Sequence, residues 1–240
     1  MRTIAIIQAR TGSTRLPGKV LMDVAGRPMI RRVLDRASRI QGIDGIAVAT
    51  PDLVEDDGLS DLVHGLGYRV VRGPAHDVLE RYLLAADAME ADVVVRLTSD
   101  CPLLSPSVSS LVVERFQTGT FDYCSNTIER TWPRGLDTEV VDLRALRIAG
   151  REASTPSDRE HVTPFVWRQP DRFRLESVST LPDRSDLRWT VDTPNDLELV
   201  RRVFAGMSED DFDLPEILDL LRREPALLHL NRDVRQKPVE

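Results

Sequence analysis

Three cations lie in one short loop near the start of the chain, residues 8–19. The loop reads Q-A-R-T-G-S-T-R-L-P-G-K and carries Arg10, Arg15 and Lys19 beside glycines and hydroxyl side chains. Free backbone N–H groups in such a loop can surround phosphate oxygens, and the cations can offset the charge that develops on a leaving pyrophosphate. The loop therefore predicts a triphosphate site, with a solvated basic loop as the alternative.

The spacing of Gly12 and Gly18 distinguishes this loop from two familiar phosphate-binding motifs. A Walker loop requires G-x4-G-K followed by Ser or Thr, whereas here five residues separate the glycines and Val20 follows Lys19. The dinucleotide fingerprint G-x-G-x-x-G is absent as well. The predicted nucleotide-binding residues of the loop are Gln8, Ala9, Arg10, Gly12, Ser13, Arg15 and Lys19.

Two aspartates, Asp100 and Asp192, occur in the similar contexts S-D-C-P and V-D-T-P. We expect each of them at the carboxyl end of a strand. Two carboxylates brought together there could hold Mg²⁺, which takes carboxylate oxygens, substrate phosphates and water. The alternative is a turn-forming or helix-capping use.

A segment at residues 130–139, R-T-W-P-R-G-L-D-T-E, is polar, aromatic and rich in hydrogen-bonding groups. Arg134 offers a planar fork that suits a carboxylate, and Asp137 and Glu139 could hold sugar hydroxyls. The alternative is that these charges are solvated and that Trp132 is a surface or dimer-contact residue.

The elements that must position these residues alternate along the first half of the chain. Apolar runs predict strands, and apolar residues at helical spacing predict helices between them. The strands are Thr3–Gln8, Gly45–Thr50, Tyr68–Val71 and Ala91–Thr98; the helices are one from Pro28, Asp56–Leu66 and His76–Met89. This alternation predicts right-handed βαβ units in a parallel sheet with helices on both faces. Such sheets bind ligands at the carboxyl ends of their strands, where the first loop begins.

The pattern changes after about residue 120. The predicted strands there are Phe121–Ser125, Leu136–Asp142, Phe173–Ser179 and Leu187–Val191, and the predicted helices are Leu143–Arg151, Ser157–Arg168, 193 to about 204, and Leu214–Arg223. No linker divides the chain. We therefore predict one α/β domain over residues 1–240, with a core of residues 1–205 and a C-terminal helix and tail of residues 206–240.

Arg72 and the two cysteines also bear on which residues could form a functional site. Arg72, in V-V-R-G, follows the third predicted strand and could contact the base or ribose, although a structural use fits as well. Cys101 and Cys124 are too few for a disulfide framework or a metal cluster.

The composition is that of a globular protein, with 41% hydrophobic and 30% charged residues. A net charge of −7 argues against broad binding of nucleic acid or an anionic membrane. No signal peptide or membrane span is evident, so we expect a cytoplasmic protein. Only Lys19 and Lys237 of the 32 basic residues are lysines, so a lysine in the first loop stands out.

Several motifs together carry a resemblance to a known family, over about residues 3–205. They are the first loop, V-V-R-L-T-S-D-C-P-L at 94–103, the segment 125–139, R-E-H-V-T-P at 159–164, and L-R-W-T-V-D-T-P at 187–194. The chain resembles the cytidylyltransferases that activate 3-deoxy-2-keto sugar acids, the CMP-KDO synthetase and acylneuraminate cytidylyltransferase group. Within that group it is most similar to the spore coat polysaccharide biosynthesis protein F branch.

The resemblance implies a single-domain Rossmann-like nucleotidyltransferase fold, related to the GT-A fold, with a mixed, mostly parallel sheet. It implies that CMP passes from CTP to the anomeric hydroxyl of a sugar acid, with Mg²⁺ held by Asp100 and Asp192. The nucleotide site then also includes Arg72 and Asp100. The implied catalytic residues are Arg10, Lys19, Asp100 and Asp192, and the implied acceptor residues are Arg134, Asp137, Glu139, Glu160 and His161. A homodimer formed through the segment 121–141 is implied as well.

Three alternatives stay open. The first is the same chemistry on another acceptor, such as a phosphonate or an amino-sugar acid. The second is a nucleotide-sugar glycosyltransferase, a class that usually carries Asp-x-Asp where this chain has Asp100-Cys101-Pro102. The third is a non-catalytic nucleotide-binding protein, which loss of Lys19 or of either aspartate would favour.

Overall fold

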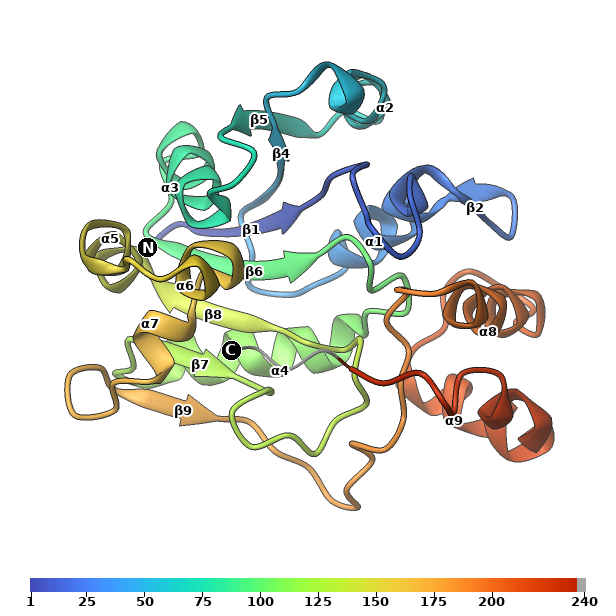
Figure 1. Ribbon diagram of the computed structural model, residues 1–240. Coiled ribbons are helices and arrows are strands. Elements are labelled where there is room, and N and C mark those ends of the chain that lie inside the picture. The colour runs from blue at the N-terminus through green and yellow to red at the C-terminus, as the bar shows by residue number, and fades with distance from the viewer. Residues whose placement is uncertain (237–240) are drawn as a thin grey trace.

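A central sheet organises the protein, and the computed structural model describes residues 1–236 of it (Figure 1). Within those residues, seven strands pair in the order β5-β4-β1-β6-β8-β7-β9. The strands are β1 Thr3–Gln8, β4 Gly45–Pro51, β5 Arg69–Gly73, β6 Val93–Thr98, β7 Tyr123–Ser125, β8 Glu139–Asp142 and β9 Leu175–Ser177. Only the two pairings that involve β8 are antiparallel. The prediction of a mixed, mostly parallel sheet is confirmed.

Helices cover both faces of this sheet, as predicted (Figure 1). One face packs against α1 Met29–Ala37, α2 Asp57–Gly65 and α4 Pro106–Thr118; the other packs against α3 Val78–Ala88, α5 Leu143–Glu152 and α7 Pro164–Trp167. The alternation within β1 explains the two layers, because successive side chains of a strand point to opposite faces. Ala5 and Ile7 enter the first layer, and Ile4 and Ile6 the second, all of them fully buried.

A third apolar cluster lies at the carboxyl side of the sheet and supports the loops there. It is formed by α8 Pro194–Ala205 and α9 Leu214–Arg223 together with Trp132, Leu136 and Trp189. A capping box starts α8, since Thr193 and Asp196 satisfy each other's backbone N–H groups. Trp132 is 8% exposed, and its Nε1 donates to Val178 O at 2.8 Å. Trp132 is therefore part of its own core and not a surface residue.

One predicted strand is wrong. The segment 187–191 is extended but belongs to no strand, because it pairs with two different loops in turn. Trp189 N donates to Arg134 O at 2.7 Å, and Val191 N donates to Asp100 O at 2.8 Å. Asp192 therefore follows an extended segment and not a sheet strand.

Two helices also differ from the prediction. The predicted helix Ser157–Arg168 is two short ones, α6 Pro156–His161 and α7, because Val162 adopts φ 75° and Pro164 has no backbone N–H to continue the hydrogen bonds of α6. Helix α4 lies where no element was predicted, although Ser105 caps it by accepting from Val108 N at 3.2 Å.

Two smaller features complete the fold. A two-stranded ribbon joins β2 Asp23–Val24 to β3 Arg27–Pro28. None of the helices in residues 1–236 has the length and apolar character needed to cross a membrane. The division into core and C-terminal extension stays a prediction, and residues 237–240 of that extension lie outside the described chain.

Candidate active site

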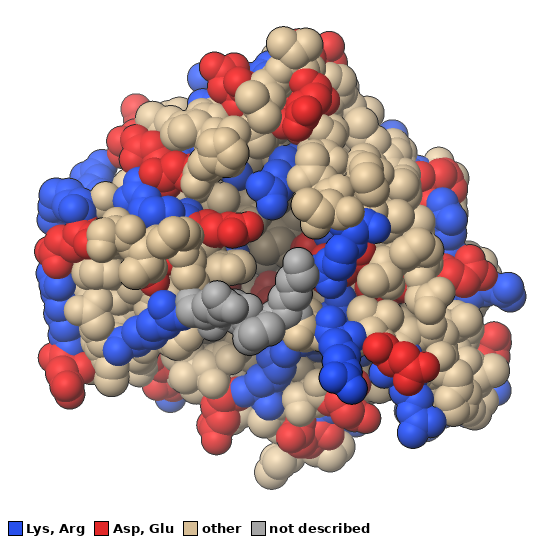
Figure 2. Space-filling model, in the orientation of Figure 1, with Lys and Arg blue, Asp and Glu red and all other residues tan. Residues whose placement is uncertain are grey.

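A cleft of about 760 Å³ lies at the carboxyl ends of β1 and β6. Figure 2 shows the surface hollowed near its centre on this face, with charged side chains of both signs around the hollow. Most of the predicted site residues line the cleft. They are Gln8, Ala9, Arg10, Ser13, Arg15, Lys19, Asp100, Arg134, Asp137, Glu139, Glu160, His161 and Asp192.

The first loop is held at both of its ends. Thr11 donates its N–H and its hydroxyl to Asp56 Oδ1, at 2.7 and 2.9 Å, which ties the loop to the 3-10 turn Val54–Asp56. Gly18 adopts φ 69°, a left-handed conformation that suits glycine. The chain can therefore turn there into a second 3-10 turn, Lys19–Leu21, whose first side chain points into the cleft.

Lys19 joins the two aspartates at the floor of the cleft. Its Nζ lies 3.0 Å from Asp100 Oδ2, 3.0 Å from Asp192 Oδ1 and 2.6 Å from Val191 O. The residue is only 8% exposed, and burial alone would lower the pKa of its ammonium. The two carboxylates outweigh that effect and raise the pKa of Lys19 above 10.5. A fixed positive charge is thus held between two negative ones.

Asp192 receives two further cations. Arg15 Nη2 lies 3.0 Å from its Oδ1, and Arg188 Nη2 lies 2.7 Å from its Oδ2. Burial would raise the pKa of Asp192, but Lys19, Arg188 and Arg15 together lower it below 3.8. Asp100, in contrast, accepts from the Thr98 hydroxyl at 2.6 Å as well as from Lys19.

The chemistry of this donor set fits Mg²⁺ that arrives with a phosphate ligand. Asp100 and Asp192 direct oxygens at one point, which the Lys19 ammonium contacts at 3.0 Å from each. Among residues 1–236, no group of three or more His, Cys, Asp or Glu side chains forms a metal cage. Mg²⁺ in nucleotide sites typically uses one or two carboxylates and completes its shell with phosphate and water. Two carboxylates therefore suffice for a substrate-borne ion.

The part of the cleft around the predicted acceptor residues contains two neighbouring arginines, Arg130 and Arg134. Arg130 binds Asp137 through two bonds of 2.7 and 2.8 Å, so Asp137 is already paired. Arg134 lines the cleft, and no described residue makes a hydrogen bond or ion pair with its side chain. Burial and the charge of Arg130 lower the pKa of Arg134. An incoming anion would relieve this repulsion.

Glu139, which was predicted to hold sugar hydroxyls, is buried and already has partners. It is 7% exposed, pairs with Arg96, and accepts from Thr163 and from Tyr123 OH, the latter at 2.9 Å. Arg96 also donates to Gln8 Oε1 at 3.1 Å. Burial would lower the pKa of Arg96, but Glu139 raises it above the ordinary value. This pair therefore forms part of the cleft floor.

Helix α6 brings the last two predicted residues to the mouth of the cleft. Glu160 lies 3.6 Å from Arg10 of the first loop, so the two halves of the cleft meet there. Burial and the charge of Arg96 lower the pKa of His161 below 6.5. This shift favours the neutral form of the His161 imidazole.

Two predicted nucleotide residues do not line the cleft. Arg72 binds Asp57 at 2.5 Å and Leu53 O at 2.6 Å, which ties β5 to the neighbouring turn. Gly12 lies beside Glu55, whose Oε1 would be 3.1 Å from an added Cβ. These contacts of Arg72 match the structural role that the sequence left open.

Several lining residues were not predicted. They include Arg81, Arg96, Thr98, Arg130, Thr163, Trp167 and Gln236. A signal existed for Arg96, since it interrupts an apolar strand that is covered on both faces, and for Arg130, which lies in the segment singled out above. Gln236 has no such signal, because only the folded chain brings its C-terminal segment to the cleft.

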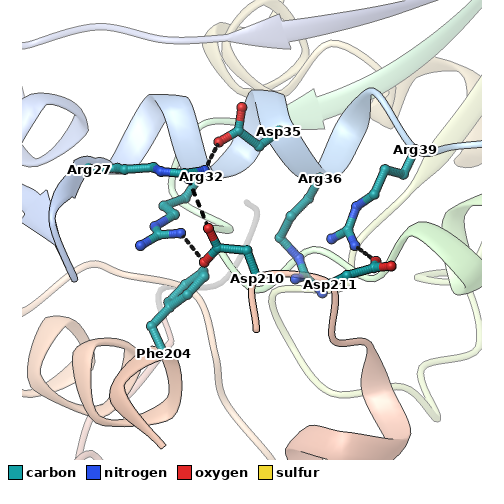
Figure 3. Close-up of a pocket in the computed structure, with 8 residues that line it drawn as sticks. All are labelled: Arg27, Arg32, Asp35, Arg36, Arg39, Phe204, Asp210 and Asp211. Carbon is teal, nitrogen blue, oxygen red and sulfur yellow. Dashed lines mark hydrogen bonds and ion pairs between the residues drawn. The ribbon is translucent and has the colours of Figure 1, made fainter. Parts of the chain in front are cut away.

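A smaller cavity of about 190 Å³ lies elsewhere, between α1 and the chain that follows α8 (Figure 3). Arginines of α1 meet aspartates there, and Arg32 Nη1 lies 2.6 Å from Asp210 Oδ1. Arg32 and Arg36 also stack on Phe204 and Phe212, at 4.4 and 4.5 Å from the ring centroids. Its charges are largely paired with one another.

Known proteins share the sequence and the fold of this chain. The family model described as cytidylyltransferase matches residues 4–221. An uncharacterized protein of Methanocaldococcus jannaschii is 36% identical over 240 residues, which cover 99% of this chain and 97% of the relative. The spore coat polysaccharide biosynthesis protein SpsF of Bacillus subtilis is 32% identical over 92% of this chain and 94% of its own. The 3-deoxy-manno-octulosonate cytidylyltransferase of Anaeromyxobacter dehalogenans is 32% identical over 86% and 99%.

Solved structures share the fold. A cytidylyltransferase from Leptospira borgpetersenii superposes with a TM-score of 0.92 at 28% identity and covers 99% of each chain. CMP:2-keto-3-deoxy-manno-octonic acid synthetase complexed with CTP superposes with a TM-score of 0.66 at 20% identity and covers 85% of this chain and 99% of its own. At 20% identity, the second similarity shows only that the fold is shared.

Proposed function

Since this chain belongs to the cytidylyltransferase family and is therefore a nucleotidyltransferase, we propose that it transfers CMP from CTP to a sugar acid. The proposed acceptor is the anomeric hydroxyl of a 2-keto-3-deoxy acid, and pyrophosphate is the second product. The observation that carries the proposal is the Lys19 ammonium at 3.0 Å from both Asp100 and Asp192, at the floor of an open cleft.

The phosphate half of the cleft would bind the triphosphate through Arg10, Arg15 and Lys19. Lys19 keeps its charge because the aspartates raise its pKa, so it can stabilise negative charge on the leaving pyrophosphate. Asp100 and Asp192 would hold Mg²⁺, which supplies charge neutralisation at phosphate oxygens when bound. Arg15 contacts Asp192 and so lies where its guanidinium can turn from carboxylate to phosphate.

The acceptor half would bind a carboxylate next to the reacting hydroxyl. Arg134 is the cation with no partner among the described side chains, and Arg130 beside it is held in place by Asp137. A fork-shaped guanidinium binds a carboxylate through two parallel bonds. Such a contact would orient the acid for in-line attack on the α-phosphorus, which is the main task of a phosphoryl-transfer site.

The names of two relatives support a sugar acid as the proposed acceptor. One is named for cytidylyl transfer to 3-deoxy-manno-octulosonate and one for spore coat polysaccharide biosynthesis. A phosphonate or amino-sugar acid is the second candidate acceptor, because the unpaired Arg134 would bind a phosphonate as readily as a carboxylate. The homodimer remains a proposal, since only one chain is described.

The test is a pyrophosphate-release screen of ATP, CTP, GTP and UTP against a panel of acids in the presence of Mg²⁺. The panel contains 3-deoxy-manno-octulosonate, an acylneuraminate, an amino-sugar acid and a phosphonate. We expect release with CTP and a 2-keto-3-deoxy acid, and none when either substrate is omitted. Tight CTP binding without turnover of any acid would overturn the proposal and favour a non-catalytic protein.

A further inference from the structure

The C-terminal segment returns to the cleft after α9. The last helical turn, Pro225–His229, is followed by Asn231, which is 6% exposed. Asn231 Nδ2 donates to Arg188 O at 2.9 Å and to Asp196 Oδ1 at 2.8 Å. In Figure 1 the red end of the chain runs from α9 back toward the sheet. Gln236 then lines the cleft itself.

Arg188 connects this segment to the predicted metal ligand. Its Nη1 donates to Gln236 Oε1, its Nη2 lies 2.7 Å from Asp192 Oδ2, and its Nε lies 3.1 Å from Asp196 Oδ1. All three nitrogens of the partly buried Arg188 guanidinium thus have a partner. A change in the position of the segment therefore reaches the Asp192 carboxylate through a single rigid group.

The backbone around Arg188 also connects Gln236 to Arg134, the proposed acceptor residue. Residues 187–189 pair through their backbones with Arg134, since Arg134 N donates to Leu187 O at 2.9 Å and Trp189 N donates to Arg134 O at 2.7 Å. Arg134 and Arg188 thus lie on neighbouring backbone segments. Gln236, bound to Arg188, lines the same cleft as Arg134.

The chemistry of the amide suits a polyhydroxylated acid. Gln236 Oε1 accepts from Arg188, and no described residue takes a hydrogen bond from its Nε2. An amide nitrogen has two N–H donors. Neither donor is used by residues 1–236, so both could bind hydroxyl or carboxylate oxygens of an acceptor.

We propose that Gln236 is an acceptor-specificity residue and that Arg188 positions it together with Asp192. The inference rests on the proposed function and adds to it a part of the chain that the cytidylyltransferase family model does not include, since that match ends at residue 221. The Leptospira borgpetersenii enzyme covers 99% of this chain, so its comparison extends beyond that limit.

The cavity of Figure 3 shows how the segment is anchored. Asp210, which follows α8, lies 3.0 Å from Arg27 and 2.6 Å from Arg32. Asp213 caps α9 and accepts from Ser107 N at 3.0 Å. Helix α9 is thus fixed to α1 and α4, and the chain that leaves it reaches Arg188 from a defined position.

The first experiment compares Gln236→Ala with Arg235→Ala, an exposed neighbour that does not line the cleft. The acceptor is 3-deoxy-manno-octulosonate, or whichever acid of the panel the wild type turns over. We expect Gln236→Ala to raise the KM for the acid about tenfold, as the loss of a hydrogen bond predicts. The KM for CTP should stay within about twofold, and Arg235→Ala should match the wild type.

The second experiment tests the link to Arg188 with a double-mutant cycle. Arg188→Lys keeps the charge but cannot bind three partners with one fork. We expect it to lower kcat and to weaken Mg²⁺-dependent CTP binding in calorimetry. Adding Gln236→Ala to it should change the acceptor KM by less than about twofold, because Gln236 would already be released.

The outcomes separate this inference from the proposed function. An active wild type whose acceptor KM is unchanged by Gln236→Ala overturns the specificity role alone. Additive effects in the cycle overturn the positioning role of Arg188. A wild type that releases no pyrophosphate with any acid overturns the proposed function, and this inference with it.

Discussion

The two halves of the cleft are built in different ways. The phosphate half comes mainly from one continuous loop, residues 8–19, whose cations converge on Asp100 and Asp192. The proposed acceptor half is assembled from segments far apart in the chain, near residues 96, 130–139, 160 and 236. In the first half residue type was enough to find the candidates. In the second, pairing between segments decides which charges are free.

The two acidic residues predicted in the proposed acceptor half illustrate this difference. Asp137 and Glu139 were both predicted to hold sugar hydroxyls, yet Arg130 binds the first and Arg96 pairs with the second. Arg134 was predicted from the same segment and remains unpaired among the described residues. A buried charge is stable only when it is paired or hydrogen-bonded, so most charges in this half already have partners before any substrate binds.

The largest effect is expected from a substitution at the centre of the phosphate half. Asp192→Asn removes a charge that Lys19, Arg15 and Arg188 share, and we expect kcat for pyrophosphate release to fall about 10³-fold. Asp186→Asn, an exposed carboxylate nearby, is the control. Release at the wild-type rate from a folded Asp192→Asn protein would show that Asp192 has no part in the chemistry.

Lys19→Ala should lower kcat about 10²-fold, since the loop still supplies Arg10 and Arg15. Lys19→Arg tests the geometry, because Lys19 is only 8% exposed and its ammonium lies 3.0 Å from each of two carboxylates. We expect little rescue by arginine, measured as single-turnover release of pyrophosphate. Full activity of Lys19→Arg would mean that only the charge matters.

Arg134→Ala should affect the other half of the cleft. We expect the KM for the acid to rise about 10- to 100-fold, as for a lost bond to a charged group, with the KM for CTP nearly unchanged. Arg151→Ala, on an exposed face of α5, controls for the loss of one positive charge. A rise in the KM for CTP instead would assign Arg134 to the phosphates.

The smallest effect is expected for Arg72→Ala. Its guanidinium is bound to Asp57 and Leu53 outside the cleft, so the KM for CTP should change less than about twofold. A small drop in thermal midpoint is the expected cost of the lost ion pair. A large loss of CTP affinity, measured by calorimetry, would show that Arg72 contributes to nucleotide binding, as the sequence predicted.

Local patterns made much of the fold predictable. Strand β1 was predicted with its observed bounds, and the apolar face of α1 is buried as its spacing indicates. The segment 187–191 shows the limit, because its apolar alternation suits a strand but its backbone partners are two separate loops. Helix α4 was missed although its Ser105 cap and first-turn Pro106 were readable.

The sequence by itself determined the family, the cation-rich loop after the first strand, and the two aspartates. These depend on residue types at short spacing, and on turn and strand preferences that act locally. Only the tertiary structure decided that one ammonium joins both aspartates, that Glu139 is already paired, and that Gln236 reaches the cleft. Those contacts join residues from 43 to 173 positions apart, and the direction in which each loop projects its side chains comes from packing, which no local pattern contains.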